Sequence, residues 1–313
     1  MVAIISRLLL LVQIAIVAGV VCALMHLFGM RTIPALLAGT ATLLLVRMLI
    51  TANNFRLAWR LGSATPPPYR LNLRKACRLY LEEFRSSMLS SSWSMPFGAF
   101  TGYEAPQSRG LPVLLIHGYG CNSGYWRSMS RRLRAAGITH HALSLEPVFG
   151  TIDSFVPVVH AAVERLCRDS GSQRIVLLAH SMGGLVARAY LCAHGEERIA
   201  RVITLGTPHH GTGLANFGVG SNSAQMRRVP GAIGNTPSAW LQQLFAQENS
   251  GRYALFISIY SHHDNIIAPQ TSSHLPGARN IALDGIGHVA LGLNPRVQKI
   301  VIDEIRAAGR DAE

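Results

Sequence analysis

The sequence predicts an α/β fold with a mostly parallel sheet and helices on both faces, preceded by a pair of apolar segments. From about residue 98, short apolar runs alternate with stretches of helical periodicity, which is typical of a parallel sheet. Before that point, two apolar stretches long enough for membrane-spanning helices follow each other. We therefore expect a membrane anchor (residues 1–55), a basic linker with an amphipathic helix (56–97) and a large α/β domain (98–313).

Composition excludes several classes of protein. The chain has 313 residues, of which 49% are hydrophobic and 14% are charged, so a disordered or low-complexity protein is excluded. The five cysteines form no CxxC pair, which argues against a disulfide framework and against a cysteine-ligated zinc site. The net charge of +13 requires an acidic partner or an acidic surface.

The two apolar segments predict a transmembrane hairpin. Residues 8–28 form the stronger segment, and residues 33–50 form a weaker one that contains two threonines and Arg47. Arg47 lies near the end of its segment, where a long side chain reaches the membrane interface. A single span and a cleaved signal peptide, with Arg7 before the apolar run, are the alternatives.

A run of basic residues follows the second apolar segment, before the first acidic residue, Glu82. It consists of Arg56, Arg60, Arg70, Arg74, Lys75 and Arg78. Because the turn between the apolar segments carries only Arg31, the positive-inside rule predicts a multi-pass protein of a bacterial inner membrane with its large domain in the cytoplasm. A single span would place that domain on the opposite face. The position of the basic run beside the hairpin favours anionic lipid headgroups over nucleic acid as its partner.

Residues 62–70 are proline-rich and predict a semi-rigid linker, and residues 71–88 predict an amphipathic helix that leads into the domain. Strands are expected at residues 112–117, 141–145, 174–180, 201–205, 253–260 and 278–283. Helices are expected at residues 125–136, 154–168, 183–194 and 295–307. Chemistry should then gather at the carboxyl ends of the strands.

The sequence around Ser181 predicts a sharp turn between a strand and a helix. The strand RIVLLA leads into HSMGG and then into the helical stretch LVARAYLCAH. Small residues at Ala179, Gly183 and Gly184 let the strand and the helix approach closely, and a strained serine backbone would present the hydroxyl at the sheet edge. We therefore expect Ser181 to be a nucleophile, the alternative being a structural turn serine.

A serine nucleophile needs a base to accept its proton and an acid to orient that base. His288, in the loop GIGHVAL, is the expected base, and a solvated loop histidine is the alternative. Asp264, in SHHDNIIAP after an earlier strand, is the expected acid. Asp284 competes but lies only four residues before His288, and Asp153 precedes Ser181, which breaks the chain order Ser, Asp, His.

Two backbone N–H groups are expected to stabilise an oxyanion. The HGYG turn, with Gly118 and Gly120, allows the N–H of Tyr119 to point at the nucleophile, and the N–H of Met182 follows Ser181 directly. An ordinary turn at a strand exit is the alternative for HGYG.

HGYG, AHSMGG, LGTPHHGT, SHHDNIIAP and GIGHVAL occur in this order within about residues 98–307. This part of the chain resembles the α/β-hydrolase superfamily, and specifically bacterial triacylglycerol lipases. Ala179, two residues before Ser181 in the sharp turn, is a feature in which the chain resembles the Bacillus-type lipases. The sequence GTPHHGT resembles the segment before the lid in Pseudomonas and Burkholderia lipases. The resemblance implies ester hydrolysis through an acyl-enzyme. The residues that it implies are Ser181, Asp264 and His288 as the catalytic triad and Tyr119 and Met182 as the oxyanion hole.

The chain departs from those secreted lipases because it has no obvious disulfide pair and no recognisable acidic residues to flank a structural calcium, so we expect neither a metal nor a cofactor. The paired histidines lack an HExxH or comparable spacing, and His180 is expected to pack and to form hydrogen bonds. Residues 211–247 carry large apolar side chains without strand periodicity, which favours a lid over a merely structural insertion.

The expected activity is therefore that of a membrane-anchored serine hydrolase for lipid-like carboxylic esters. A thioesterase, a phospholipase or an amidase would use the same scaffold. A non-catalytic, membrane-bound binding module is the rival from another class.

Overall fold

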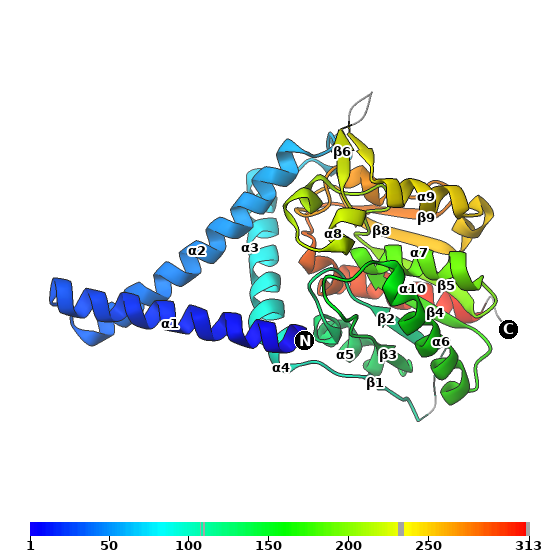
Figure 1. The fold of residues 1–313 in the computed structure, drawn as a ribbon, viewed down its shortest axis with the longest axis horizontal. Helices are drawn as coiled ribbons and strands as arrows, with labels where there is room; N and C mark the ends of the chain where they lie inside the picture. The colour runs from blue at the N-terminus through cyan, green and yellow to red at the C-terminus, as the bar shows by residue number, and fades with distance from the viewer. Residues whose placement is uncertain (107, 109, 231–234, 311–313) are drawn as a thin grey trace.

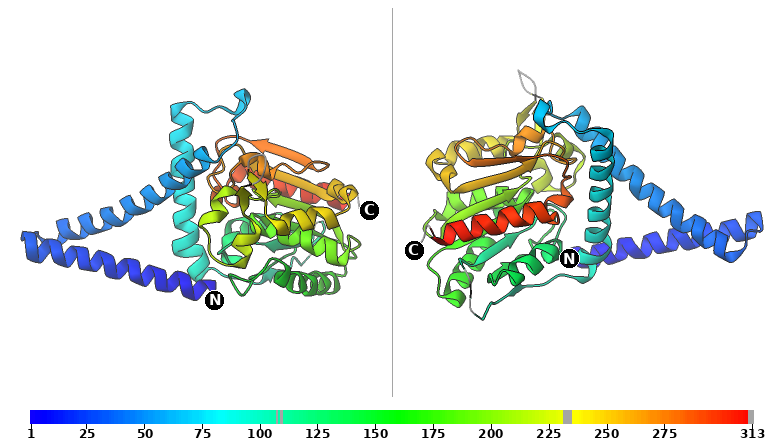
Figure 2. Two further views of the ribbon diagram at one scale, coloured as in Figure 1. Left: turned by 45° about the horizontal axis from the view of Figure 1, so that its top comes forward. Right: turned by 180° about the vertical axis from the view of Figure 1, so that it is seen from behind.

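A computed structural model of the chain describes residues 1–106, 108, 110–230 and 235–310. Two long helices, α1 (Val2–Phe28) and α2 (Thr32–Arg60), project from an α/β domain as a hairpin (Figure 1). A third helix, α3 (Leu73–Leu89), lies between this hairpin and the domain in every view (Figure 2). The N-terminal segment thus contacts the domain through α3 as well as through the near ends of the hairpin.

The hairpin helices are long and apolar enough to cross a membrane. Most of their large apolar side chains are exposed, so neither is the core helix of a soluble domain, whereas a signal sequence would have a similar length and composition. Both helices extend beyond the predicted segments, and the expected boundary at residue 55 falls inside α2. Residues 51–61 are more polar than the predicted segment, but none of them is glycine or proline, so α2 continues to Arg60.

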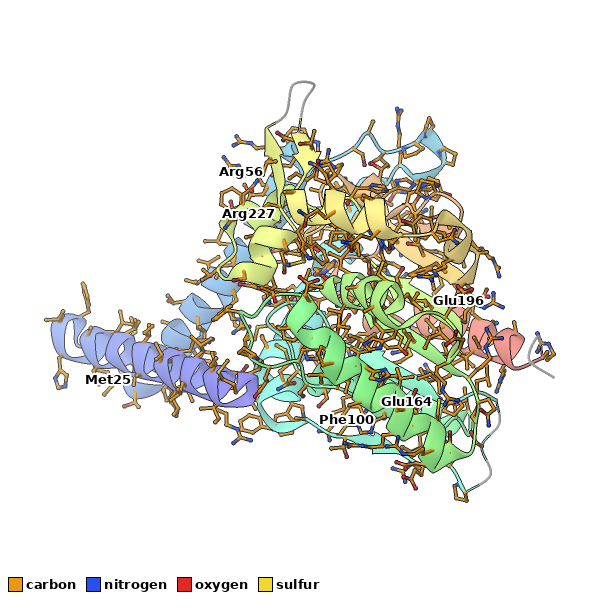
Figure 3. All side chains as sticks on the ribbon, turned by 45° about the vertical axis from the view of Figure 1, so that its right-hand side comes forward. Met25, Arg56, Phe100, Glu164, Glu196 and Arg227 are labelled. Carbon is orange, nitrogen blue, oxygen red and sulfur yellow. The ribbon has the colours of Figure 1, made fainter. Side chains whose placement is uncertain are left out.

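The two ends of the hairpin differ in their surroundings. Gly29 ends α1 with a positive φ of 62°, which favours glycine. Met25, close to this turn, lies at the end far from the domain, whereas Arg56 lies beside the domain (Figure 3). Arg56, the first residue of the basic run, is therefore near the domain, and the turn between the two helices is remote from it.

A seven-stranded sheet in the order β1-β3-β2-β4-β5-β8-β9 forms the centre of the domain. All of its neighbouring strands are parallel except β1, which pairs antiparallel with β3. The strands are β1 (Gly102–Tyr103), β2 (Val113–Ile116), β3 (His140–Ala142), β4 (Ile175–His180), β5 (Ile199–Leu205), β8 (Phe256–Ser261) and β9 (Arg279–Leu283). The predicted fold class is confirmed.

Helices cover both faces of the sheet. On one face, α6 (Val156–Ser170) and α7 (Met182–His194) build a core with residues such as Val163 and Leu185. On the other face, α5 (Arg127–Ala135) and α10 (Pro295–Arg310) contribute Met129 and Val301 to a second core. Short helical turns complete the chain: η1 (Pro67–Tyr69), η2 (Ser90–Ser94), α4 (Met95–Phe97), η3 (Ser123–Trp126), η4 (Asp153–Phe155), η6 (Ser250–Leu255), η7 (Gln270–Ser273) and η8 (Val289–Gly292).

Some predicted strand limits are wrong. The strand predicted at residues 141–145 ends at Ala142. The main-chain N–H of Leu143 still donates to the Leu115 carbonyl, but that of Leu145 donates to His117 Nε2 at 2.9 Å and is therefore not available to a neighbouring strand. Residues 253–255 belong to η6 rather than to a strand. The edge strand β1 was not predicted, since two residues are too few for a periodic pattern.

The segment expected to form a lid, residues 211–247, adds a separate layer at one end of the domain (Figure 1). It contains η5 (Gly213–Phe217), α8 (Ser221–Gln225), β6 (Arg228–Pro230), β7 (Asn235–Pro237) and α9 (Ala239–Gln247). The segment shows no strand periodicity in the sequence but contains a short strand pair, because β6 and β7 pair antiparallel. Each has three residues, which is too short for alternation to be visible, and residues 231–234 between them lie outside the described residues.

Candidate active site

Ser181 occupies the turn between β4 and α7 with a backbone conformation that side chains rarely adopt. Its φ of 54° and ψ of −126° make it the only non-glycine residue with a positive φ in the described part of the chain. Such a conformation costs about 1–3 kcal/mol and persists only where the surroundings impose it. Here the main-chain N–H of Ser181 donates to Leu205 at 2.9 Å, and the Thr207 hydroxyl donates to the Ser181 carbonyl at 2.9 Å.

Three of the four predicted turn glycines lie where no side chain would fit. A Cβ at Gly118 would be 2.8 Å from the Cβ of Ser181. At Gly183 it would be 2.4 Å from the Ile116 carbonyl, and at Gly184 it would be 2.1 Å from the Thr207 hydroxyl. The fourth, Gly120, has a positive φ of 65°. The HGYG turn therefore touches the Ser181 turn directly.

Asp264 and His288 form a buried pair. His288 Nδ1 lies 2.7 Å from Asp264 Oδ2, and this hydrogen bond assigns the proton to Nδ1. The other carboxylate oxygen, Oδ1, accepts the main-chain N–H groups of Ile266 and Ile267 at 2.8 Å each. The main-chain N–H of His288 donates to the Asn265 side chain at 2.9 Å. Both the ring and the backbone of His288 are therefore held, and Nε2 is left to accept a proton.

The surroundings of His288 favour the imidazolium. Burial by itself lowers the pKa of His288, but the charge and hydrogen bond of Asp264, together with the charge of Glu83, outweigh it, so the pKa is raised. His180, whose ring centroid lies 4.6 Å from that of His288, donates from Nε2 to the main-chain carbonyl of His288 at 3.1 Å. Burial holds the pKa of His180 well below its ordinary value, so this histidine stays neutral.

The glycine that follows β5 brings Ser181 and the buried pair into one place. A Cβ at Gly206 would lie 3.0 Å from Asp264 Oδ2 and 3.3 Å from His288 Nδ1, while its neighbour Leu205 accepts the Ser181 N–H. Within the described ranges, Ser181 Oγ has no hydrogen-bonded partner. Catalytic hydrogen bonds often tighten only when substrate is bound, so this geometry is compatible with proton transfer from Ser181 to His288.

The two expected oxyanion donors have no acceptor within the described part of the protein. Among the described residues, the main-chain N–H groups of Tyr119 and Met182 donate to no other protein group. Met182 is the first residue of α7, where an N–H has no partner within the helix and the helix dipole favours negative charge. The turn that carries Tyr119 is packed against Ser181 through Gly118.

The competing aspartates lie elsewhere. Asp284 is bound by Arg296 at 3.2 Å and faces Lys75 at 3.8 Å, at the groove beside α3. Asp153 accepts hydrogen bonds from Gln225 and Trp240 of residues 211–247, the expected lid, which we call the lid segment. Neither is paired with His288.

The segment expected to form a lid contacts the HGYG turn. The Tyr119 hydroxyl donates to the Val219 carbonyl at 2.7 Å and accepts the Val219 N–H at 3.1 Å. Three large apolar side chains near this contact are exposed. Phe149, whose ring lies 6.2 Å from that of Tyr119, is 46% exposed, and Phe217 and Val219, on the same loop, are 69% and 67% exposed. Ser181 is only 7% exposed. The three apolar side chains form an apolar rim beside the HGYG turn, and Ser181, which packs against that turn, is almost covered.

Sequence reasoning missed two residues that hold the His288 loop. Asn265 directly follows Asp264, and its position in the motif was the available signal. Glu83 accepts the main-chain N–H groups of Val289 and Ala290, but a glutamate on an amphipathic helix gives no sequence signal of burial. Among the described residues, no group of three or more histidine, cysteine, aspartate or glutamate side chains is placed to hold a metal.

Comparison with known proteins identifies relatives of this domain. A triacylglycerol lipase of Pseudomonas fragi is 28% identical over 193 residues, which are 56% of this chain and 55% of that protein. A triacylglycerol lipase of Pseudarthrobacter phenanthrenivorans is 30% identical over 115 residues, 34% of this chain and 35% of that protein. The chain therefore spans about half the length of the first relative and about a third of the second.

A solved structure has the same fold. The mature form of a Bacillus licheniformis lipase superposes with a TM-score of 0.57 at 16% identity, over 66% of this chain and 97% of that one. The family model for the alpha/beta hydrolase fold matches residues 112–272, just over half of the chain, which include Ser181 and Asp264. With the sheet, the turn at Ser181 and these relatives together, the chain belongs to the α/β hydrolase fold family.

Proposed function

We propose that this protein is a membrane-anchored serine hydrolase that cleaves carboxylic esters of lipid-like substrates through an acyl-enzyme. The observation that carries this proposal is the buried Asp264 and His288 pair, 2.7 Å apart, beside the strained turn of Ser181. Strain and burial of this kind cost stability and are typical of functional sites.

The reaction begins with attack of Ser181 Oγ on the ester carbonyl carbon while His288 Nε2 accepts the serine proton. Asp264 stabilises the imidazolium, and the N–H groups of Tyr119 and Met182 stabilise the oxyanion, at about 3–4 kcal/mol for one donor. His288 then gives the proton to the leaving alcohol. Water, activated by His288, hydrolyses the acyl-enzyme and restores Ser181.

A lipid-like acyl group is favoured by the apolar rim. Exposed Phe149, Phe217 and Val219 offer contact to an acyl chain beside the expected oxyanion position. The lid segment is bound to the turn of Tyr119 through Val219, so we expect substrate access to involve movement of this segment, as in gated active sites. The two relatives named as triacylglycerol lipases support the same substrate class.

The anchor is the α1 and α2 hairpin, with residues 1–55 in the membrane and residues 56–97 at its surface. The proposed contacts with anionic lipid come from exposed basic side chains, namely Arg56, Arg60, Arg70, Arg74, Lys75 and Arg78. Both ends of the hairpin are then cytoplasmic. A C-terminal reporter that is active only in the periplasm would contradict this topology.

Hydrolysis of p-nitrophenyl esters tests the function. The detergent-solubilised full chain is compared with Ser181→Ala on acyl chains of two, eight and sixteen carbons, below and above the concentration at which the substrate forms micelles. We expect Ser181-dependent turnover that favours long chains and rises above the micellar concentration. Preference for short chains would reassign the protein as an esterase, and no turnover by folded protein would contradict the proposal.

A further inference from the structure

Glu83, on α3, lies in the hydrolase core although it belongs to the N-terminal segment. Its exposed fraction is 0%. Oε1 accepts the main-chain N–H of Val289 and Oε2 accepts that of Ala290, each at 3.0 Å. These are the two residues that follow His288, and more than 200 positions separate them from Glu83 along the chain.

The loop before His288 is shaped around this carboxylate. A Cβ at Gly287 would lie 2.4 Å from Glu83 Oε2, so only glycine leaves room for the side chain. Burying a carboxylate is unfavourable unless hydrogen bonds replace its water. Burial raises the pKa of Glu83, and the two N–H groups at the start of η8, which have no helical carbonyl to bond to, act in the opposite direction by donating to the charged carboxylate.

The charged and titratable groups around His288 and its loop come from four separate elements. Asp264 follows β8, His180 ends β4, and Glu83 comes from α3. Tyr125, from η3, binds the same loop through its hydroxyl, which donates to Val289 at 3.2 Å and accepts the N–H of Gly292 at 3.1 Å. Glu83 is the one negative charge besides Asp264 that acts on His288 among the described residues.

We propose that Glu83 is a positioning residue for His288, which holds the His288 loop in place through its two main-chain bonds and stabilises the imidazolium with its charge. This inference rests on the proposed serine hydrolase function. It also links the hairpin to the active site. The helix α3, which carries Glu83, contacts the hairpin, because the Tyr80 hydroxyl of α3 donates to the Met48 carbonyl of α2 at 2.7 Å. A helix in contact with the hairpin thus completes the surroundings of His288.

The charge of Glu83 predicts a specific pH signature. This charge is one of the contributions that raise the pKa of His288. The Glu83→Gln variant removes it, so the pKa of His288 falls and the acid limb of kcat/KM against pH moves to lower pH. The amide also presents an NH₂ group to one of the two N–H donors, so kcat at the plateau falls by about tenfold to a hundredfold, the effect of a small misplacement of a catalytic group.

Glu82→Gln is the matched control. Glu82 is the neighbouring residue on α3, undergoes the same change of charge, and bonds to the Asn294 side chain at 2.5 Å rather than to the His288 loop. The full chain of each variant is assayed in detergent with a p-nitrophenyl ester for kcat, KM and the pH profile, with thermal unfolding measured alongside. We expect Glu82→Gln to have the wild-type profile and Glu83→Gln to have a lower kcat, a similar KM and the shifted acid limb.

A Glu83→Gln variant with the kcat and acid limb of the control overturns the proposal. So does one that loses thermal stability but keeps the acid limb, because Glu83 is then only structural. If Glu83→Gln does not fold, Glu83→Asp is the deciding variant, because it keeps the charge but shortens the side chain. We then expect the wild-type acid limb with a lower kcat. An unchanged kcat in Glu83→Asp overturns the proposal. Wild-type protein without esterase activity would instead overturn the proposed function itself.

Discussion

The hydroxyl of Tyr119 both donates to and accepts from the main chain of Val219, at 2.7 and 3.1 Å. One side chain of the expected oxyanion turn is therefore bound to the lid segment. Because the expected oxyanion donor is the main-chain N–H of Tyr119, its side chain is free to take this second role. The contact holds the lid segment at the turn whose Gly118 packs against Ser181.

Tyr119→Phe removes this contact and keeps the main-chain donor. The contact consists of two hydrogen bonds of about 1 kcal/mol each, so we expect a gain of about fivefold to thirtyfold in kcat/KM on a short, fully dissolved ester, where no interface assists opening. The dependence on micelles should weaken in parallel. An unchanged or lower kcat/KM on the dissolved ester would show that the contact does not limit access.

Asp264→Asn keeps the shape of the acid and removes its charge. The amide cannot hold His288 in the same tautomer while Oδ1 serves Ile266 and Ile267. By analogy with other serine hydrolases we expect kcat to fall by about 10⁴-fold. Asp284→Asn is the comparison, because Asp284 binds Arg296 and Lys75 and should leave kcat within about twofold. Equal losses in the two variants would contradict the assignment of the acid.

The acid limb of the wild-type pH profile reports on His288. The base must be neutral to accept a proton, and the pKa of His288 is raised above the ordinary value of about 6.5. We therefore expect kcat/KM for a dissolved ester to rise with pH through a midpoint above about 6.5. A midpoint well below that value would contradict the buried arrangement with Asp264 and Glu83.

His117 should make stability depend on pH. Burial lowers the pKa of His117 to about 4, against about 6.5 in an unfolded chain, so between these values the unfolded state binds one more proton and stability falls as the pH falls. Its neutral ring accepts the N–H of Leu145 at Nε2. His117→Gln should flatten the pH dependence of Tm between about pH 6.5 and 4, measured by thermal unfolding in detergent. The slope will not vanish, because other buried histidines contribute, but an unchanged slope would contradict the assignment.

Gly184→Ala should disturb the Ser181 turn. The added methyl would lie 2.1 Å from the Thr207 hydroxyl, which itself bonds to the Ser181 carbonyl. Overpacking of this kind costs about 1–3 kcal/mol, and displacement of Thr207 should also lower kcat. Gly309→Ala, on α10, serves as control because its new methyl has ordinary contacts of 3.6 Å or more. Wild-type stability and kcat in Gly184→Ala would contradict the close packing of the turn.

The parts of the site that local sequence determines were predictable. The turn at Ser181 depends on neighbouring small residues, and His288 and Asp264 follow strands that the apolar pattern indicates. Their pairing across 24 positions follows from the parallel sheet, which brings strand ends to one edge. The short strands β1, β6 and β7 were not predicted, because two or three residues are too few to show an alternating pattern.

Glu83 could not be predicted for a different reason. Its burial arises from packing between α3 and a loop more than 200 residues away, and nothing in the local pattern distinguishes it from Glu82. The same holds for the Tyr119 contact, which joins residues 100 positions apart. Such contacts depend on the tertiary arrangement and become visible only in the folded chain.

Covalent trapping of the nucleophile tests the central claim most directly. Detergent-solubilised protein is treated with a fluorophosphonate, and the adduct is located by mass spectrometry of the intact chain and of its peptides, with Ser181→Ala and His288→Ala alongside. We predict one adduct per chain on Ser181, no adduct in Ser181→Ala and much slower labelling of His288→Ala, because the serine then lacks its base. Folded wild-type protein that remains unlabelled with lipid micelles present, or an adduct on another residue, would contradict the account.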